Sequence, residues 1–132
     1  MNKQTLIKNI FKLKTIAVVG MSPKLERASH YVSLYMKNNG FQIIPVNPGQ
    51  KFINNEKCYK NLKEIPFSID IVNVFRRSEY VLPIVADAIE INAKAIWLQD
   101  GVISEEAANL SKKANIMFIM NDCMLRQHQI LN

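Results

Sequence analysis

Five short apolar segments, alternating with stretches of helical character, are the feature that most constrains how this chain folds. Apolar, β-branched runs of this length are typical of strands that are buried on both faces of a sheet. Strands that alternate with helices predict a parallel sheet, because right-handed crossovers place the helices on both of its faces. We therefore expect a doubly wound, Rossmann-like α/β fold. Its five predicted strands are 15–20 (TIAVVG), 41–46 (FQIIPV), 69–75 (IDIVNVF), 94–98 (KAIWL) and 116–120 (IMFIM).

Serine residues mark the expected starts of three of the intervening helices. Ser29, Ser78 and Ser104 can each cap a helix N-terminus, and a shorter helix is expected over 58–65. A short tail follows the last strand. With 132 residues and no repeats or linkers, the chain is expected to form a single domain over residues 1–132. Four apolar residues at helical spacing predict one more helix, at the start of the chain: Leu6, Ile7, Ile10 and Phe11.

The charge of the chain favours an anionic partner without choosing one. Seventeen Lys and Arg against eleven Asp and Glu give a formal net charge of +6, which suits nucleic acid, a membrane surface or a phosphorylated small molecule. The basic residues are spread along the chain, which disfavours a nucleic-acid-binding arm. A merely lysine-rich surface explains the charge equally well.

Two further features bear on the cellular setting. No apolar run approaches the roughly 18–20 residues that a membrane span needs. Cys58 and Cys123 have no close cysteine partner and indicate neither a disulfide framework nor a zinc site. We therefore expect a cytoplasmic protein.

The predicted topology selects the loops that can carry a site. In parallel α/β sheets, ligands bind outside the carboxyl ends of the strands, where the strand order reverses. The site residues should therefore come from the loops 20–29, 46–51, 75–78, 98–104 and 120–128.

The first of these loops has the character of a phosphate site. It follows a strand and leads into a helix N-terminus, which offers free N–H groups and a positive dipole end to an anion. Gly20 stands alone, so the dinucleotide fingerprint G-x-G-x-x-G is absent. A glycine at this turn is common in such folds and is a weak signal by itself. The loop carries polar and basic side chains instead: Ser22, Lys24, Arg27 and Ser29.

The end of the second strand disfavours NAD. NAD sites place Asp or Glu there to bond the adenosine ribose, whereas this chain has Val46, Asn47 and Pro48. A neutral turn with Lys51 close by permits a ribose that carries a phosphate. A plain turn explains Asn47 and Pro48 equally well.

The third and fourth strands deliver basic and aromatic residues to the same rim. Arg76 and Arg77 predict an anion clamp, although one of them could instead pair with Glu79. Trp97 can flank an adenine or a pantetheine arm, or lie in the core. Gln99 and Gly101 follow it at the rim.

No catalytic or metal-binding residue is predicted. Cys123 and His128 share one loop, so a thiol–imidazole pair is conceivable, but burial of Cys123 is the expected outcome. His30 is expected to pack. The loops contain no nucleophile elbow, metal-ligand cluster or close pair of acids.

Taken together, these loops resemble the small stand-alone CoA-binding proteins, which are related to the CoA-binding domain of the succinyl-CoA synthetase alpha subunit. The chain departs from the family pattern at Asn54 and Asn55, at Asn73, and in the residues before Cys123 and His128. The segments that carry the resemblance run in order along nearly the whole chain: 16–22 (IAVVGMS), Arg27, 40–48 (GFQIIPVNP), 70–78 (DIVNVFRRS), 97–99 (WLQ), Gly101, Cys123, Met124 and His128.

The resemblance implies a Rossmann-type fold with coenzyme A or an acyl-CoA lying across the strand ends. The first loop would cradle the nucleotide phosphates, the end of the second strand would border the adenosine, and the third loop would hold the rim. The expected cofactor-binding residues are Gly20, Met21, Ser22, Pro23, Lys24, Arg27, Ser29, Val46, Asn47, Pro48, Phe75, Arg76, Arg77, Gln99 and Gly101.

Three functions stay open at this point. The first is a CoA- or acyl-CoA-binding module without catalysis of its own. The second is a small NAD- or nucleotide-binding enzyme, and the third is an interaction module with a vestigial cleft. Nucleic acid is a weak fourth partner. Synthetase activity is not expected, because the synthetase relatives use a second domain for their phosphohistidine chemistry. A partner enzyme and self-association both remain open.

Overall fold

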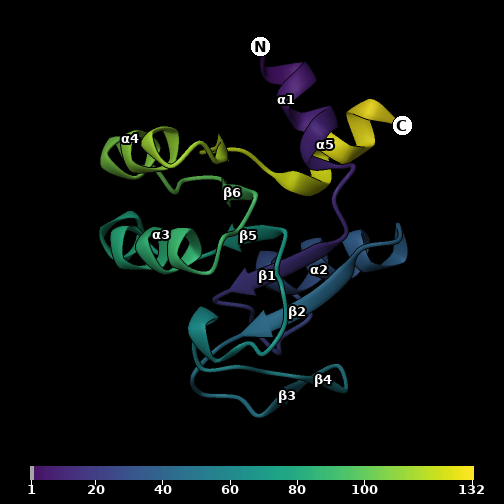
Figure 1. Cartoon of the computed structure of the whole chain (residues 1–132). Helices are drawn as coiled ribbons and strands as arrows, with labels where there is room; N and C mark the ends of the chain where they lie inside the picture. Colours follow the sequence, from purple (N-terminus) through teal and green to yellow (C-terminus); the bar gives the residue numbers. More distant parts are fainter. Residues whose placement is uncertain (1) are drawn as a thin grey trace.

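The computed structural model describes residues 2–132 and shows a parallel sheet between two layers of helices (Figure 1). The strands lie in the order β2-β1-β5-β6-β7. This arrangement confirms the predicted Rossmann-like α/β fold. The five parallel strands are β1 (Thr15–Val19), β2 (Gln42–Val46), β5 (Ile71–Val74), β6 (Ala95–Leu98) and β7 (Met117–Ile119).

The strand order reverses between β1 and β5. The chain passes from β1 outward to β2 and then returns to the other side of β1 for β5. Val19 pairs with Val74 at the carboxyl ends of β1 and β5, and the N–H of Phe75 donates to the carbonyl of Val19 at 2.9 Å. A reversal of this kind leaves a crevice outside the strand ends, which is where ligands bind in such sheets.

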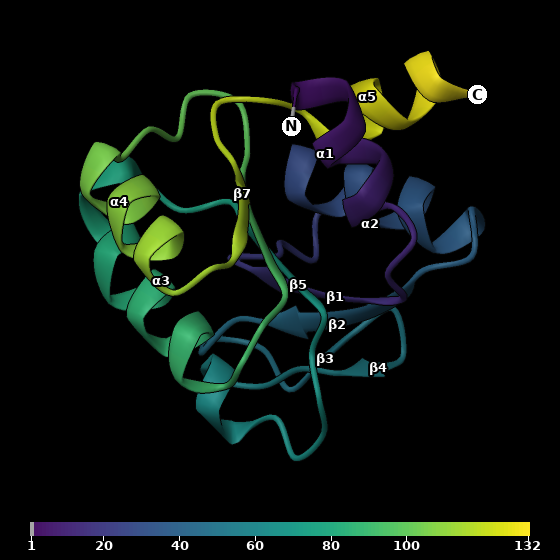
Figure 2. The same cartoon turned by 45° about the horizontal axis from the view of Figure 1, so that its top comes forward.

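Both faces of the sheet are covered by helices, as Figure 2 shows. Successive residues of β1 point to opposite faces, so Ile16 joins one core and Ala17 joins the other. Helices α3 (Val81–Glu90) and α4 (Glu105–Lys113) cover one face. The other face is covered by α1 (Lys3–Ile10), α2 (Ala28–Asn38) and α5 (Met124–Leu131).

The expected helix at the start of the chain is confirmed. Helix α1 is capped by the side chain of Asn2, which accepts from the N–H of Thr5, and it buries Ile7 and Ile10. Within residues 2–132, no helix combines the length and the apolar character that crossing a membrane requires.

The helix predicted over 58–65 is wrong. A small hairpin, β3 (Phe52–Ile53) and β4 (Glu56–Lys57), precedes this segment, and within it there is helical structure only as a 3₁₀ turn, Leu62–Glu64. Tyr59 instead forms a parallel bridge with Val46, at the outer edge of β2. The hairpin turns on two asparagines, Asn54 and Asn55, with φ of 53° and 64°, as tight hairpin turns require.

One of the three predicted serine caps is confirmed and two are wrong. Ser104 caps α4 by accepting from the N–H of Ala107 at 3.1 Å. Ser29 lies inside the first turn of α2, whose N-cap residue is Arg27. Ser78 begins a 3₁₀ turn, Ser78–Tyr80, and its hydroxyl accepts from the N–H of Ile103 at 2.9 Å. The expected tail is helix α5.

Candidate functional site

Gly20 stands where β1 ends, and the chain approaches itself closely there. Its φ of +88° is left-handed, and a Cβ at this position would lie 2.9 Å from the carbonyl oxygen of Phe75 and 2.9 Å from Cδ of Arg76. Glycine is therefore required both by the backbone conformation and by the available space. The loops that follow β1 and β5 meet at this residue, at the reversal of the strand order.

The first hollow beside Gly20 is a cavity of about 220 Å³, here called the inner cavity. Its apolar lining suits a flat, largely apolar group such as a purine base. Lys60, Asn61, Arg76 and Asp87 supply its polar positions. The apolar part of the lining is Val19, Val46, Pro48, Leu62, Tyr80 and Ile84.

The second hollow, of about 450 Å³, lies at the N-terminus of α2 and is here called the helix hollow. The N-cap residue Arg27 makes no side-chain cap, and the first turn of α2 contains no acidic residue. The first N–H groups of a helix have no partner within it and form the positive end of its dipole. Ser22, Lys24 and Arg27 line the same hollow, so helix end and side chains together favour an anion.

The third hollow, of about 340 Å³, is lined by Asn47, Phe75, Arg76, Arg77 and Tyr80 and is here called the arginine hollow. The guanidinium of Arg76 lies over the ring of Tyr80, 5.8 Å from its centre. Within the described residues neither arginine forms an ion pair, so the expected alternative, a pair with Glu79, is not found. Two guanidinium groups are thus available at the reversal of the strand order.

The loop after β1 is held in place by side chains behind it. Nδ2 of Asn47 donates to the carbonyl of Met21 at 2.8 Å. The N–H of Ser22 donates to Oγ of Ser29 at 2.9 Å, and Nδ1 of His30 lies 2.8 Å from the carbonyl of Ser22. A loop held in this way is ordered before any ligand arrives, which lowers the entropic cost of binding.

Eleven of the fifteen residues predicted to bind the cofactor line the three hollows, and the remaining four do not. Met21 is buried in the core beside α2, and Pro23 is exposed. Gln99 is buried, and its Oε1 accepts from the N–H of Met124 at 3.1 Å. Gly101 donates its N–H to Oδ1 of Asn121 at 2.8 Å.

Of the two positions expected for Trp97, at the rim or in the core, the structure shows the core. Its side chain is fully buried, stacks on Phe11 with ring centres 5.7 Å apart, and donates from Nε1 to the carbonyl of Asp122 at 2.9 Å. It therefore does not flank a ligand at the rim.

No thiol–imidazole pair is formed between the described side chains of Cys123 and His128. Nδ1 of His128 lies 2.8 Å from the hydroxyl of Tyr35, and its ring packs edge-on against Phe11 and Phe41. The expected burial of Cys123 is met only in part, since this residue is half-buried at the start of α5. His30 is fully buried, as expected. Among residues 2–132, no three His, Cys, Asp or Glu side chains gather as metal ligands would.

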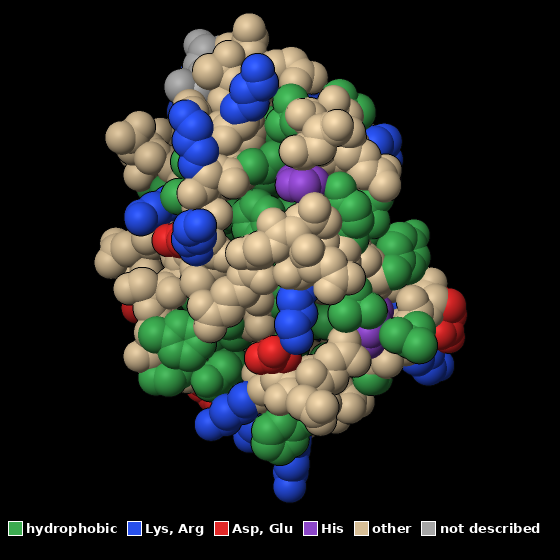
Figure 3. All heavy atoms as spheres, turned by 90° about the vertical axis from the view of Figure 1, so that its right-hand side faces the viewer, with side chains coloured by type: hydrophobic (Ala, Val, Ile, Leu, Met, Phe, Trp, Pro, Cys, Tyr) green, Lys and Arg blue, Asp and Glu red, His purple; other side chains and the backbone are tan. Residues whose placement is uncertain are grey.

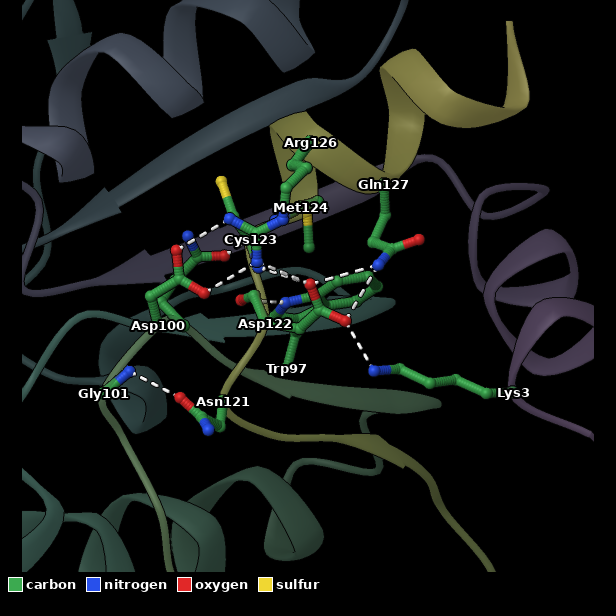
Figure 4. A network of polar contacts seen from close by, with 11 residues as sticks. Lys3, Trp97, Asp100, Gly101, Asn121, Asp122, Cys123, Met124, Arg126 and Gln127 are labelled. Atoms are coloured by element: carbon green, nitrogen blue, oxygen red, sulfur yellow. Dashed lines mark hydrogen bonds and ion pairs between the residues drawn. The ribbon is translucent and has the colours of Figure 1, made fainter.

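At the carboxyl ends of β6 and β7, away from the three hollows, Asp122 is the centre of a network of polar contacts (Figure 4). Its carboxylate accepts from Nζ of Lys3 at 2.6 Å and from Arg126 at 2.9 Å, and also from Gln127 and from the N–H of Cys123. Burial alone would raise the pKa of Asp122, but these donors outweigh it and hold the pKa below its ordinary value. Here the charges pair with one another, whereas Arg76 and Arg77 beside β5 form no ion pair with any described residue.

The Lys and Arg side chains are distributed differently on the face of the molecule opposite the hollows. Seen from the side of the sheet where the strands begin, the Lys and Arg side chains are dispersed among neutral ones (Figure 3). Lys24, Arg27, Lys60, Arg76 and Arg77, by contrast, converge on the hollows around Gly20.

Sequence reasoning missed the residues that close the inner cavity on the side of β2. The bridge between Tyr59 and Val46 adds one parallel residue beyond β2, so Lys60 and Asn61, which follow it, lie at the carboxyl edge of the sheet and line the cavity. Tyr80 and Ile84 close it from the other side. A pairing of one residue leaves no periodic pattern by which a sequence could reveal it.

Comparison with known proteins places the chain in a family. The model of the CoA binding domain matches residues 14–129. The uncharacterized protein YneT of Bacillus subtilis (strain 168) is 42% identical over 117 residues, which are 89% of this chain and 87% of YneT. A hypothetical protein from Pyrococcus horikoshii OT3 has a similar structure, with a TM-score of 0.93 and 31% identity, over 99% of this chain and 92% of that one.

A longer relative is acetate–CoA ligase [ADP-forming] II of Archaeoglobus fulgidus. It is 28% identical over 102 residues, which are 76% of this chain but 15% of the ligase. The similarity thus concerns one segment of that enzyme. From the family match and the relatives together, this chain belongs to the CoA-binding domain family.

Proposed function

We propose that this chain binds coenzyme A or an acyl-CoA at the carboxyl ends of β2, β1 and β5. The observation that carries the proposal is the N-terminus of α2, which lacks a side-chain cap and opens into a hollow with Lys24 and Arg27. Arg76 and Arg77, which form no ion pair with another described residue, lie in the adjoining arginine hollow. Membership of the CoA-binding domain family supports the choice of ligand.

The three hollows suit the parts of the ligand. The helix hollow, with Ser22 and Arg27, would hold the pyrophosphate at the helix dipole. The inner cavity, bordered by Val46 and Pro48, would hold the adenine. An adjoining groove is lined by Pro48, Lys51, Lys57 and Lys60. Lys60, which lines this groove and the inner cavity, would face a phosphate on the ribose.

The same geometry argues against NAD as the preferred ligand. The end of β2 carries no acid for the ribose hydroxyls. Asn47, which stands there, uses its amide to hold the carbonyl of Met21 and the N–H of Gly49. A small NAD-binding enzyme is therefore the less supported alternative.

The proposed role is ligand binding, with the acyl-group chemistry supplied by a partner enzyme. A segment similar to this chain makes up 15% of a protein named acetate–CoA ligase, so such a domain can accompany ligase machinery. We assign the side chains of the three hollows to ligand binding, and those behind the loop after β1 to holding that loop in place.

Binding isotherms of arginine variants test the proposal. Arg27→Ala and Arg76→Ala are each expected to weaken CoA binding about tenfold, since a hydrogen bond to a charged group contributes about 1.5–3 kcal/mol. Lys113→Ala removes a positive charge at the far end of α4 and should change the affinity less than about twofold. CoA affinity that is unchanged in both arginine variants would contradict the proposal.

A further inference from the structure

His30 is fully buried, and both of its ring nitrogens have polar partners. Nδ1 lies 2.8 Å from the carbonyl oxygen of Ser22, and Nε2 lies 2.9 Å from Nδ2 of Asn54. A carbonyl can only accept, so the ring hydrogen must sit on Nδ1. Nε2 is then the acceptor for the amide of Asn54, which fixes the tautomer from both sides.

The carbonyl that His30 holds belongs to the loop of the helix hollow. Ser22 precedes Pro23, which has no N–H, so this carbonyl is the one polar group of its peptide unit. If the peptide turned toward the helix hollow, it would present a partial negative charge to an anion. Ser22 lines that hollow, whereas its carbonyl points to the buried imidazole behind it.

The neighbouring carbonyl is held in the same manner. Nδ2 of Asn47 binds the carbonyl of Met21, so two successive carbonyls of the loop are tied down by side chains from different elements. Asn54 extends this link to the hairpin of β3 and β4, which an exposed ion pair of Glu56 with Lys37, at 3.1 Å, also joins to α2.

We propose that His30 is a positioning residue for the loop of residues 20–29. It holds the Ser22 carbonyl turned into the interior and so keeps the helix hollow free of negative charge. Asn54 holds the imidazole in the tautomer that this task requires. The inference rests on the proposed function insofar as the anion in the helix hollow is that of CoA.

Three variants separate positioning from packing. His30→Asn keeps a donor in the place of Nδ1, because Nδ2 of asparagine and Nδ1 of histidine are both bonded to Cγ. His30→Leu fills the space without a donor. Val32→Ala is the matched control, since Val32 is buried on the same helix and belongs to the core, so its loss lowers stability without a change in the contacts of Ser22.

Two quantities are measured: the dissociation constant for CoA and the hydrogen-exchange rate of the Ser22 amide in the ligand-free protein. His30→Leu should weaken CoA binding about tenfold and speed this exchange about tenfold. His30→Asn should stay within about threefold of the wild type in both quantities. Val32→Ala should lower the unfolding temperature and leave both unchanged.

Several results would overturn the inference. His30→Asn could weaken CoA binding and speed the Ser22 exchange as much as His30→Leu does, which would mean that His30 only fills space. Alternatively, His30→Leu could leave both quantities unchanged. Imidazole ¹⁵N spectra of the wild type that place the hydrogen on Nε2 would also refute it, whether or not the variants fold. If the wild type binds no CoA, the proposed function fails, while the exchange rates still decide the role of His30.

Discussion

Asp122 shows how one buried carboxylate holds three elements together. It joins Lys3 of α1 to the turn between β7 and α5, and Arg126 connects it to Asp100 after β6. Its side chain is 5% exposed, compared with 56% for Asp100. Replacing this carboxylate is costly because it accepts hydrogen bonds from the N–H of Cys123 and from Gln127, besides its ion pairs with the half-exposed Lys3 and Arg126.

Asp122→Asn is therefore expected to lower the free energy of unfolding at pH 7 by about 1.5–3 kcal/mol. Since the pKa of Asp122 is lowered in the folded state, its carboxylate stabilises the fold above about pH 4, and this contribution is lost as the pH falls further. The difference between variant and wild type should shrink accordingly. Urea unfolding at pH 7 and pH 3.5 measures it.

The matched control is Asp100→Asn, which removes an exposed carboxylate that binds the same arginine. Its effect should stay within about 1 kcal/mol at either pH. Equal losses from the two variants would show that the network at Asp122 contributes no more than a surface pair.

Lys60 offers a second test at the scale of one residue. It lines both the inner cavity and the groove beyond it, so we expect Lys60→Ala to weaken binding of CoA about five- to tenfold and that of 3′-dephospho-CoA less than twofold. Lys57→Ala is the control, because the Lys57 ammonium in the same groove lies over the ring of Tyr59. Equal losses for the two ligands in Lys60→Ala would assign Lys60 a different role.

At the scale of elements, the N-terminus of α2 lacks a stabilising side-chain cap from its N-cap residue. A residue such as Ser at the N-cap commonly stabilises a helix by about 0.5–2 kcal/mol relative to a residue that cannot cap, but Arg27 occupies this position and makes no cap. The helix end is thereby left open to an anion.

Arg27→Ser should separate these two effects. The free energy of unfolding without ligand is expected to rise by about 0.5–1 kcal/mol, while CoA affinity falls about tenfold. Arg27→Ala should weaken CoA binding to the same extent, but should not raise the free energy of unfolding. If Arg27→Ser binds CoA as tightly as the wild type, the N-terminus of α2 is not the phosphate site.

The elements also show what a sequence can predict. The strands were predictable because each lies in a short, mostly apolar run, and the loops of the hollows follow from their carboxyl ends. The hairpin of β3 and β4 was not, since strands of two residues show no periodicity. Ser29 and Ser78 look like caps, but their hydroxyls bind the N–H groups of Ser22 and Ile103, which are contacts that only the folded chain creates.

At the scale of the whole molecule, the two halves of the sheet's carboxyl edge differ in how their charged side chains are paired. Beside β6 and β7, Asp100 and Asp122 neutralise Lys3 and Arg126. Beside β1 and β5, the described arginines have no acidic partner, in a protein whose formal net charge is +6. An anion should therefore bind beside β1 and β5. Its affinity should fall as the salt concentration rises.

Calorimetric titration with CoA, 3′-dephospho-CoA and NAD at two salt concentrations tests this account most directly. It predicts one CoA site per chain, weaker binding once the 3′-phosphate is removed, weaker binding again at the higher salt, and NAD as the weakest ligand. NAD that binds as tightly as CoA would contradict it, and so would the absence of binding by all three in protein shown to carry no copurified ligand.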